Sequence, residues 1–464
     1  MLHNDFCHIL TLRVHLILNH QPNGGNASTI QKLLMLMRSN FLKLLTLLFA
    51  SSLMAQTGHI LQGIGAKNLS MGGAATGNPI DISGAIHWNP ASLTAFEGNQ
   101  LKIDIGFFFS APGLSSTVPT QQGIFSGTTA DDRGVSVMPN IAYAWGKEGS
   151  KSRYAISAFG ISGFGVTFPE SNTNPINFPQ NMGGFGKIQS DYALLQMAFT
   201  WSYKVSETFS IGLAPTFNYA TLELMPNPTA NPSQTAGYPS TDKANTFGFG
   251  AQFGLFYDSG SGFKTGVSYK SKQSFGSFEF NNTYLDNSTG TNSFDMDYPA
   301  VYSVGIGYSK NKVDFALDYR YIDYENTAGF NAAGWTQTAS VAGFGWENIS
   351  VISAGLQYKG IEKLPLRFGY TYSSNPISEA VAFFNVPATA IIKNAYQFGF
   401  SYEVSDKVGL DFVYHHGTSS GDTSGPLNNP MLISNTNPYG AIPGSSVSYN
   451  MTTDMIMIGF SYDF

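Results

Sequence analysis

The sequence predicts an all-β protein: a 14-stranded antiparallel transmembrane β-barrel with an amino-terminal hatch (plug) inside its lumen. Only 12% of the 464 residues are charged, about half the fraction typical of soluble domains, and 14% are aromatic. No run of about 20 apolar residues is available for a membrane-spanning helix. A chain that faces lipid without such helices must satisfy its backbone in a closed barrel. From residue 99 onward, apolar and polar side chains alternate, as strands of such a barrel require.

Residues 1–55 are expected to comprise an upstream segment and a cleaved signal peptide. Basic residues between Lys32 and Lys43 precede a short apolar run, residues 44–53, which is followed by Ala55. This order of basic, apolar and small residues is typical of a secretory signal peptide. The apolar run is too short to span a bilayer.

The segment before the signal peptide, residues 1–34, has two interpretations. Either the natural start is Met35 or Met37, or the segment is a true extension. The only cysteine, Cys7, lies within it. The predicted mature chain, which begins at Gln56, therefore has no disulfide and no cysteine-based metal site.

The hatch is predicted in residues 56–98, where the strand pattern is absent. Small residues between Gly72 and Gly77 allow the backbone to approach the surrounding wall closely. Asn89 and Pro90 predict a turn or the start of a short helix, because Asn caps a helix and Pro suits its first position.

The barrel is predicted in residues 99–464. The ninth strand shows the pattern, because Val313, Phe315 and Leu317 face one way and Asp314 and Ala316 face the other. The fourteen expected strands are residues 99–109, 134–146, 152–164, 190–205, 208–222, 244–258, 261–280, 298–309, 311–323, 346–358, 363–375, 393–404, 406–417 and 450–464.

The connections distinguish a barrel from a soluble β-sandwich, which has the same side-chain period. Short polar turns alternate with long connections along the whole strand region. A membrane barrel with one rim of tight turns and one rim of long loops produces this order. The expected long connections are residues 110–133, 165–189, 223–243, 281–297, 324–345, 376–392 and 418–449.

Tyrosines recur at the ends of the even-numbered strands, beside a short turn or the carboxyl terminus. Side chains at this height on the lipid face form the aromatic girdle of a membrane barrel. Ordinary strand-end tyrosines are the alternative interpretation. The six are Tyr203, Tyr257, Tyr308, Tyr358, Tyr402 and Tyr462.

The predicted hatch carries three short pieces in a fixed order: Met71-Gly72-Gly73-Ala74, then Asp81, then Asn89-Pro90-Ala91. Followed by an all-strand chain that ends at Phe464, they resemble the hatch of the FadL-like outer-membrane proteins, the long-chain fatty-acid transporter family. The resemblance covers the chain from the hatch to its end.

The resemblance implies passive uptake of hydrophobic small molecules, such as fatty acids or aromatic hydrocarbons, across the outer membrane of a Gram-negative bacterium. It implies release sideways into that membrane through a gap at a kinked third strand. The expected partners are the ligand, outer-membrane lipid and the barrel assembly machinery, which reads a terminal aromatic residue such as Phe464. Neither a cofactor nor a metal ion is expected.

The third predicted strand contains three glycines near its outer end, Gly160, Gly163 and Gly165. Glycines can support a bulge or bend that interrupts strand pairing. Alternatively, they merely fit beside aromatic rings on the sheet. Their position matches the lateral opening that the family resemblance implies.

Apolar residues in the long connections are candidate ligand contacts, because clusters of them mark binding grooves. They can equally pack against one another and stiffen the loops. The candidates are Phe159, Phe164 and Phe168 in the third strand and its loop, and Phe383 and Phe384 in the loop at 376–392.

Three cations are expected to face the lumen, Lys264, Arg320 and Arg367. A carboxylate head group in an apolar lumen would need such a partner. Pairing with the inward carboxylates Asp314, Asp318 or Asp411 is the alternative, and we favour it.

Other functions have weaker support. A net charge of −6, with no basic run after residue 55, does not indicate nucleic-acid binding. Residues 417–421 fit the G-x-S-x-G pattern, but no helix is expected to follow, as a nucleophile elbow requires. His415 and His416 are neighbours on a strand and point to opposite faces. The main alternative is the barrel component of a protein secretion or surface-attachment system, and an outer-membrane enzyme is a more distant one.

Overall fold

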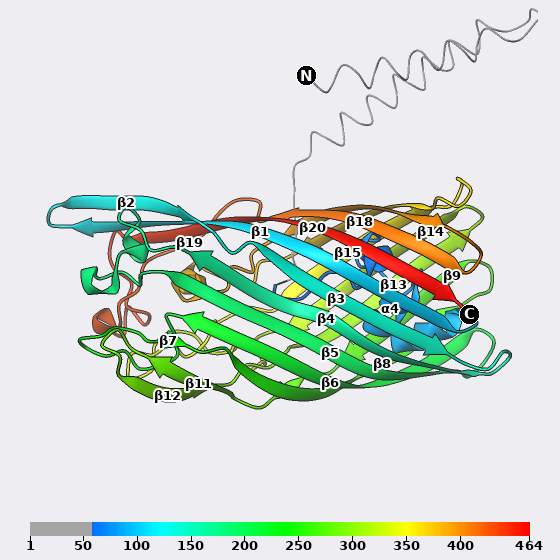
Figure 1. The fold of residues 1–464 in the computed structure, drawn as a ribbon, viewed down its shortest axis with the longest axis horizontal. Coiled ribbons are helices and arrows are strands. Elements are labelled where there is room, and N and C mark those ends of the chain that lie inside the picture. Colours follow the sequence, from blue (N-terminus) through cyan, green and yellow to red (C-terminus); the bar gives the residue numbers. More distant parts are fainter. Residues whose placement is uncertain (1–57) are drawn as a thin grey trace, which may run out of the picture. The chain divides into compact units, whose positions relative to one another are not determined.

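The structure, a computed structural model that describes residues 58–464, confirms the antiparallel barrel with a hatch inside it (Figure 1). The predicted signal peptide and the segment before it lie outside the described residues. Each barrel strand pairs with its neighbours along the chain, and β1 pairs with both β3 and β20, which closes the cylinder. Apart from the stretch where β3 and β4 are unpaired, closure leaves no sheet edge that would need water in the membrane.

Fourteen strands form the wall. In chain order they are β1 (Gln100–Thr120), β3 (Val135–Trp145), β4 (Ser152–Phe168), β5 (Ile188–Lys204), β6 (Phe209–Met225), β8 (Ala244–Asp258), β9 (Phe263–Lys270), β13 (Ala300–Lys310), β14 (Val313–Asp323), β15 (Ile349–Tyr358), β16 (Leu366–Ser373), β17 (Asn394–Glu403), β18 (Val408–Thr418) and β20 (Ser446–Asp463).

The remaining elements belong to the long connections and the hatch. The short strands are β2 (Gly123–Ala130), β7 (Ser240–Thr241), β10 (Ser274–Phe275), β11 (Phe278–Thr283), β12 (Thr289–Phe294) and β19 (Thr423–Gly425). The helical turns are α3 (Ala66–Leu69), α4 (Ile82–Trp88), η1 (Pro90–Ala95), η2 (Pro175–Asn177), η3 (Gln180–Met182), η4 (Glu379–Asn385) and η5 (Pro430–Leu432).

Side chains alternate along the strands between lipid and lumen. In β13, Tyr302, Val304 and Ile306 are exposed on the outside, whereas Ser303 and Gly305 are buried. The short turns gather at one end of the barrel, which we call the short-turn rim, and the long connections at the other end, the long-loop rim (Figure 1). The six tyrosines named above lie on outward-facing positions near the short-turn rim.

Two expected boundaries are wrong. The connection at 110–133 is mostly strand, because β1 continues to Thr120 and pairs with β2 in a hairpin beyond the rim. The expected strand at 261–280 is broken: β9 ends at Lys270, and β11 pairs with β12 and β7 in a small separate sheet. In both places the side-chain period is that of a strand. A strand of the wall and a strand within a long connection therefore differ only in the strand with which they pair.

The hatch lies in the lumen near the short-turn rim, where α4 appears inside the strands (Figure 1). Two of its helical turns, α4 and η1, start at residues whose side chains accept backbone hydrogens: Asp81 Oδ1 from Gly84 N at 2.9 Å, and Asn89 Oδ1 from Ala91 N at 3.1 Å. No helix within residues 58–464 is long and apolar enough to cross a membrane.

Candidate functional site

The hatch touches the wall at a belt of inward-facing glycines. At each of them a side chain would collide with a hatch residue, so the wall as well as the hatch is built for close backbone approach. The belt lies on β6, β8, β9, β13, β15, β16 and β17 and consists of Gly212, Gly254, Gly266, Gly305, Gly355, Gly369 and Gly399.

Polar side chains of the wall fix the hatch backbone. Asp318 Oδ2 accepts hydrogen bonds from the amides of Ala75 and Thr76, each at 2.8 Å. Arg320 pairs with Asp318 at 2.8 Å and donates to the Gly73 carbonyl at 2.5 Å. Its guanidinium also lies 3.5 Å from the centre of the Trp88 ring.

The predicted hatch motif lies in this contact zone. Met71 and Gly72 pack against β15 and β16, and Thr371 Oγ1 donates to the Gly72 carbonyl at 2.9 Å. Gly73 has a φ of 75°, a backbone conformation that favours glycine. Asn89 Nδ2 donates to the carbonyl of Leu255 in β8 at 3.0 Å. Pro90 and Ala91 follow at the same wall, where the Ser202 hydroxyl donates to the Pro90 carbonyl.

The barrel wall is interrupted between β3 and β4. Their pairing extends from Trp145 and Tyr154 only to Asn140 and Phe159. Beyond this point, β3 continues beside β1 as far as Val135, and β4 continues beside β5 to its end. The two strands therefore separate on the side of the long-loop rim.

The three predicted glycines lie along this interruption. The register of β4 against β5 shifts between Gly160 and Ser162, which marks a β-bulge. A Cβ at Gly160 would meet only one atom, the Pro139 carbonyl oxygen at 3.8 Å. At Gly163 it would lie 2.9 Å from the Tyr192 carbonyl oxygen, and at Gly165 it would collide with Arg133. Gly160 thus borders open space, and the other two are closely packed.

A cavity of about 500 Å³ lies at the interruption. Val137 and Pro139 of β3, Gly160 and Phe164 of β4 and Leu195 of β5 are among the residues that line it. Its polar lining includes Arg133 and Asp191, which form an ion pair at 2.5 Å. The cavity is therefore largely apolar, with a charged pair in one part of its lining.

The first described residues of the hatch occupy the free edge of β4. Leu61 N donates to the Ile161 carbonyl and Gly163 N donates to the His59 carbonyl, both at 3.0 Å. Ile60 and Ser162 form an antiparallel bridge between these contacts. This hatch segment, residues 59–61, replaces β3 as the partner of β4 on the lumen side, and Leu61 lines the cavity.

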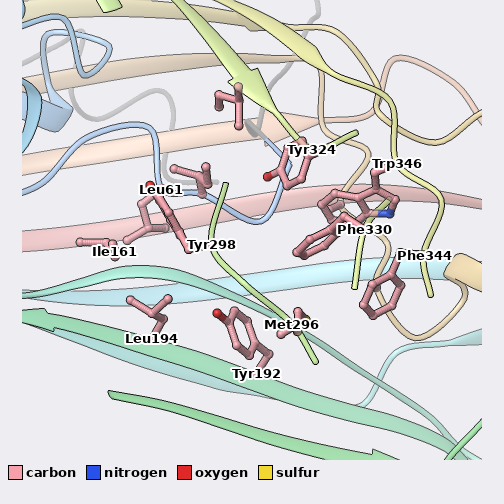
Figure 2. Packing of buried hydrophobic residues seen from close by; sticks show 14 of the residues in the cluster. Leu61, Ile161, Tyr192, Leu194, Met296, Tyr298, Tyr324, Phe330, Phe344 and Trp346 are labelled. Carbon is pink, nitrogen blue, oxygen red and sulfur yellow. The ribbon is translucent and has the colours of Figure 1, made fainter. Parts of the chain in front are cut away.

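His59 is buried in a cage of aromatic rings. Its Nδ1 lies 2.8 Å from the Tyr324 hydroxyl, and its ring stacks on Phe330 with centroids 4.9 Å apart. Tyr298, Tyr324, Phe330 and Trp346 converge beside Leu61 and Ile161 (Figure 2). Burial lowers the pKa of His59 to about 3, so the imidazole is neutral at physiological pH.

The expected aromatic ligand contacts lie in different environments. Phe164 borders the cavity and stacks on Tyr192 at 5.0 Å. Phe159 faces the lumen beside the ring of His87, with centroids 6.3 Å apart, and Phe168 is completely buried at the end of β4. Neither Phe159 nor Phe168 is part of the cavity lining.

Phe383 and Phe384 are buried in η4 and pack against Trp335, at 5.9 and 5.2 Å between ring centroids. They line a narrow apolar pocket of about 50 Å³ within the long loops. Pro387 belongs to the lining of this pocket, and Thr389 belongs to that of the larger cavity. One stretch of loop therefore borders both spaces.

The three expected cations do not line either cavity. Arg320 pairs with Asp318, as the alternative interpretation had it. Lys264 lies 3.9 Å from Asp258 near a short turn. Arg367 donates to Gln357 at 2.6 Å and to Ser401 at 2.7 Å.

Sequence reasoning did not find the His59 cage or the Arg133 and Asp191 pair. The cage combines a hatch residue with β5, the connection before β13 and the connection after β14, and no local pattern connects them. Arg133 lies at the end of residues 110–133, which the sequence pattern predicts to be a long connection.

The G-x-S-x-G segment has no neighbouring general base in its hydrogen bonds. Ser419 Oγ donates to the Gly421 carbonyl at 2.7 Å and accepts from Met451 N at 3.1 Å. Among the described residues, no group of three or more His, Cys, Asp or Glu side chains is placed to hold a metal ion.

A barrel with a lipid-facing exterior, an internal hatch and an interruption of the pairing between two wall strands defines the class of hatch-containing outer-membrane transport barrels. The family model for outer membrane transport proteins (OMPP1/FadL/TodX) matches residues 47–463. The chain belongs to this family and is an outer-membrane protein of Gram-negative type.

Solved structures share the fold. The toluene transporter TodX of Pseudomonas putida is 16% identical with a TM-score of 0.63, covering 87% of this chain and 99% of that one. A FadL homologue of Pseudomonas aeruginosa is 12% identical with a TM-score of 0.68, covering 88% and 100%. The toluene transporter TbuX of Ralstonia pickettii is 16% identical with a TM-score of 0.59, covering 87% and 99%. No curated protein matches the chain.

Proposed function

We propose that this barrel takes up hydrophobic small molecules passively from outside the cell and releases them sideways into the outer membrane between β3 and β4. Long-chain fatty acids and aromatic hydrocarbons are the ligand classes that fit. One observation carries the proposal: the wall pairing stops at Asn140 and Phe159, and a cavity of about 500 Å³ lies at that point beside the hatch. Because the hatch occupies the lumen, an exit through the wall is shorter than a path past the hatch to the short-turn rim.

The lining of the two spaces supports a route from the loops to this exit. The narrow pocket beside Phe383 and Phe384 is almost entirely apolar, and the loop from Pro387 to Ala390 borders both it and the larger cavity. Binding at each of these surfaces is favourable for an apolar ligand, because the ligand leaves water. Phe164, at the larger cavity, is the expected ligand contact that this route uses.

Arg133 is the cation that we propose for a ligand head group, in place of Lys264, Arg320 and Arg367. It lines the cavity and already pairs with a carboxylate, that of Asp191. A fatty-acid carboxylate would meet the same guanidinium, which binds carboxylates in a bidentate manner. Aromatic hydrocarbons have no such group and would use the apolar lining alone.

The test is uptake of radiolabelled oleate or toluene by Gram-negative cells that lack their own transporter of this family. Gly160→Leu places a side chain at the mouth of the cavity, where a Cβ has room. We expect uptake to slow by about tenfold, which corresponds to a barrier higher by ~1.4 kcal/mol. Gly163 is unsuitable, because a side chain there would disturb the packing of β4 on β5.

Gly113→Leu is the matched control, because Gly113 lies in β1, away from the cavity lining, and a Cβ there also has room. Folded barrel is quantified by its faster gel migration before heating. If Gly160→Leu leaves uptake at the wild-type rate with normal amounts of folded protein, release does not occur between β3 and β4.

Two further partners belong to the proposal. Outer-membrane lipid would contact the apolar exterior, and the barrel assembly machinery would recognise Phe464. The Phe464 ring is 60% exposed and leans against Tyr462, with centroids 4.8 Å apart. We also propose that the protein catalyses no reaction. No specific observation favours protein export over small-molecule transport, because both cavities are of small-molecule size.

A further inference from the structure

A second hollow lies on the outer surface of the wall, which faces lipid. We call it the outer groove, and it is formed by Ile141, Ala158, Met197, Pro215, Phe217 and Phe249 together with their neighbours. Its volume is about 610 Å³, and among the described residues that line it none is charged. Outward-facing side chains elsewhere in the membrane belt are mostly large, so a hollow here needs a local cause.

Two features of the sequence create the outer groove. Ala158 faces outward between the larger Ile141 of β3 and Met197 of β5, its direct cross-strand neighbours. In β6, Pro215 has no backbone N–H, and the pairing of β5 with β6 lapses between Ala198 and Trp201. A small side chain and an interrupted pairing thus lower the wall surface at the same height.

The outer groove continues the cavity between β3 and β4. Pro139, Gly160 and Leu195 line the cavity. Two residues further along the same three strands, Ile141, Ala158 and Met197 line the groove. Residues two apart on a strand share a face and lie roughly 7 Å from each other. The first surface that a molecule meets outside the opening, toward the short-turn rim, is therefore the outer groove.

Aromatic side chains close the other end of the outer groove. Tyr143 and Trp145 stack at 5.7 Å between centroids, and Trp145 stacks on Tyr154 at 5.9 Å. Phe199 packs against Trp145 at 6.4 Å. These rings belong to the belt near the short-turn rim, where amphipathic aromatics meet the membrane interface. The groove thus begins at the lateral opening and ends within the membrane belt.

We propose that the outer groove is a second binding site, on the outside of the barrel, which receives the hydrocarbon part of the ligand as it leaves the cavity. This inference rests on the proposed uptake function and names the site that follows it. Because the groove has no charged lining, it takes a hydrocarbon chain or ring, while a head group would remain at Arg133 in the cavity. A fatty acid therefore leaves with its chain first.

Filling the floor of the groove tests this site. Ala158→Trp places a large side chain between Ile141 and Met197 without touching the lumen. We expect uptake of oleate to slow by about fourfold, the effect of losing the contact of a single methylene group. The matched control is Ala354→Trp, because Ala354 is also an outward-facing alanine in mid-strand, on β15.

Photolabelling identifies what occupies the groove. Cells that express the protein are given palmitate with a diazirine near the end of its chain, illuminated, and the labelled peptides are identified. We expect label on the segments around Ala158 and Met197, and we expect Gly160→Leu to reduce it by about the same factor as uptake. Membrane lipid that enters the groove from the bilayer would not depend on Gly160.

The outcomes separate the two proposals. Two outcomes would refute the groove as a ligand site while the uptake function stands, provided that the wild type takes up oleate. One is that Ala158→Trp takes up oleate at the same rate as Ala354→Trp. The other is that Gly160→Leu leaves the label unchanged. The same labelling is carried out with a phospholipid that bears a diazirine. If the phospholipid labels the groove and the palmitate does not, the groove binds a membrane lipid, and the proposal is overturned. If the wild type gives no uptake above cells without the protein, the uptake function is overturned, and the groove with it.

Discussion

Single residues join the hatch to the wall, and Asp318 is one that contacts the hatch backbone directly. Its carboxylate is fully buried, accepts two backbone amides of the hatch and neutralises Arg320. A buried ion pair of this kind contributes little net stability when intact, because both charges lose water. Its removal is costly, because the remaining charge has no partner. Arg320 therefore serves the attachment of the hatch, which the inward charge alone did not reveal.

Asp318→Ala is expected to destabilise the folded barrel by about 3–5 kcal/mol, because Arg320 and the amides of Ala75 and Thr76 lose their partner. The measurement is the urea midpoint of the folded band, which migrates faster than unfolded protein on unheated gels. Asp286→Asn, in an exposed turn of the long loops, is the control and should leave the midpoint unchanged. An Asp318→Ala barrel as stable as the wild type would refute the anchoring role.

Glycines of the wall also join the hatch to the barrel. The small residues of the hatch predicted close approach, but the approach also requires Gly212 in β6 and Gly254 in β8, which have no room for a side chain beside Asn89 and Ala91. In a strand sequence, such a glycine looks no different from one that causes a bulge. Which role it has depends on the segment that lies opposite.

At the scale of elements, the hatch segment 59–61 acts as a short extra strand on β4. It satisfies backbone groups that β3 leaves free and inserts His59 among aromatic rings. The groups around the imidazole are Tyr192, Tyr298, Tyr324 and the rings of Phe164, Phe330 and Trp346. None of these carries a negative charge at neutral pH, so no counter-charge offsets the loss of hydration that burial imposes on a protonated His59.

This environment predicts a dependence of stability on pH. The pKa of His59 is about 3 in the folded hatch and about 6.5 in an unfolded chain, so only the unfolded state takes up the proton between these values. The stabilisation is complete above pH 6.5 and is lost as the pH falls toward 3. Between pH 7.5 and 4.5, His59 alone should cost roughly 2–3 kcal/mol.

The measurement is the urea midpoint of the wild type and of His59→Phe at both pH values. The phenylalanine ring fits an aromatic cage and cannot be protonated, so the variant should lose less stability at pH 4.5 than the wild type does. Other groups titrate in this range as well, but they are common to both proteins. Equal losses in the two proteins would show that His59 is not held neutral by burial.

At the scale of the whole molecule, the barrel has enough strands for a lumen wider than its side chains fill, and the hatch occupies that space. The glycine belt brings hatch and wall into contact on strands around the lumen. A barrel closed in this way is suited to a ligand that moves through small apolar spaces and not to a continuous flow of ions.

Ion conductance in planar bilayers tests this view. The full-length mature protein is expected to show no steady conductance, because the hatch obstructs the lumen. A variant that lacks residues 58–98 should conduct, since the belt of Gly212 to Gly399 would then border water. Heat-dependent gel mobility checks that the variant has folded, and Asp318→Ala serves as a second, full-length variant with a loosened hatch. Steady conductance by the wild type would contradict an obstructing hatch.

The barrel architecture can be derived from the amino-acid sequence. Alternation such as that of Tyr302, Val304 and Ile306 is a local property, since successive residues of a strand point to opposite faces wherever the strand lies. The alternation of short and long connections then indicated a barrel and not a β-sandwich. The motif from Met71 to Ala91 indicated the family, and the glycines from Gly160 to Gly165 indicated where the wall is interrupted.

Which residues line the cavities depends on how distant segments pack together. Leu61, Arg133 and Leu195 come from three distant segments, and all three line the cavity that lies where β3 and β4 separate. The same holds for the outer groove, where a small side chain on β4 matters only because β5 and β6 lose their pairing beside it. Strand periodicity is set by neighbours along the chain, whereas a hollow is set by neighbours across strands, and their register is fixed only when the cylinder closes.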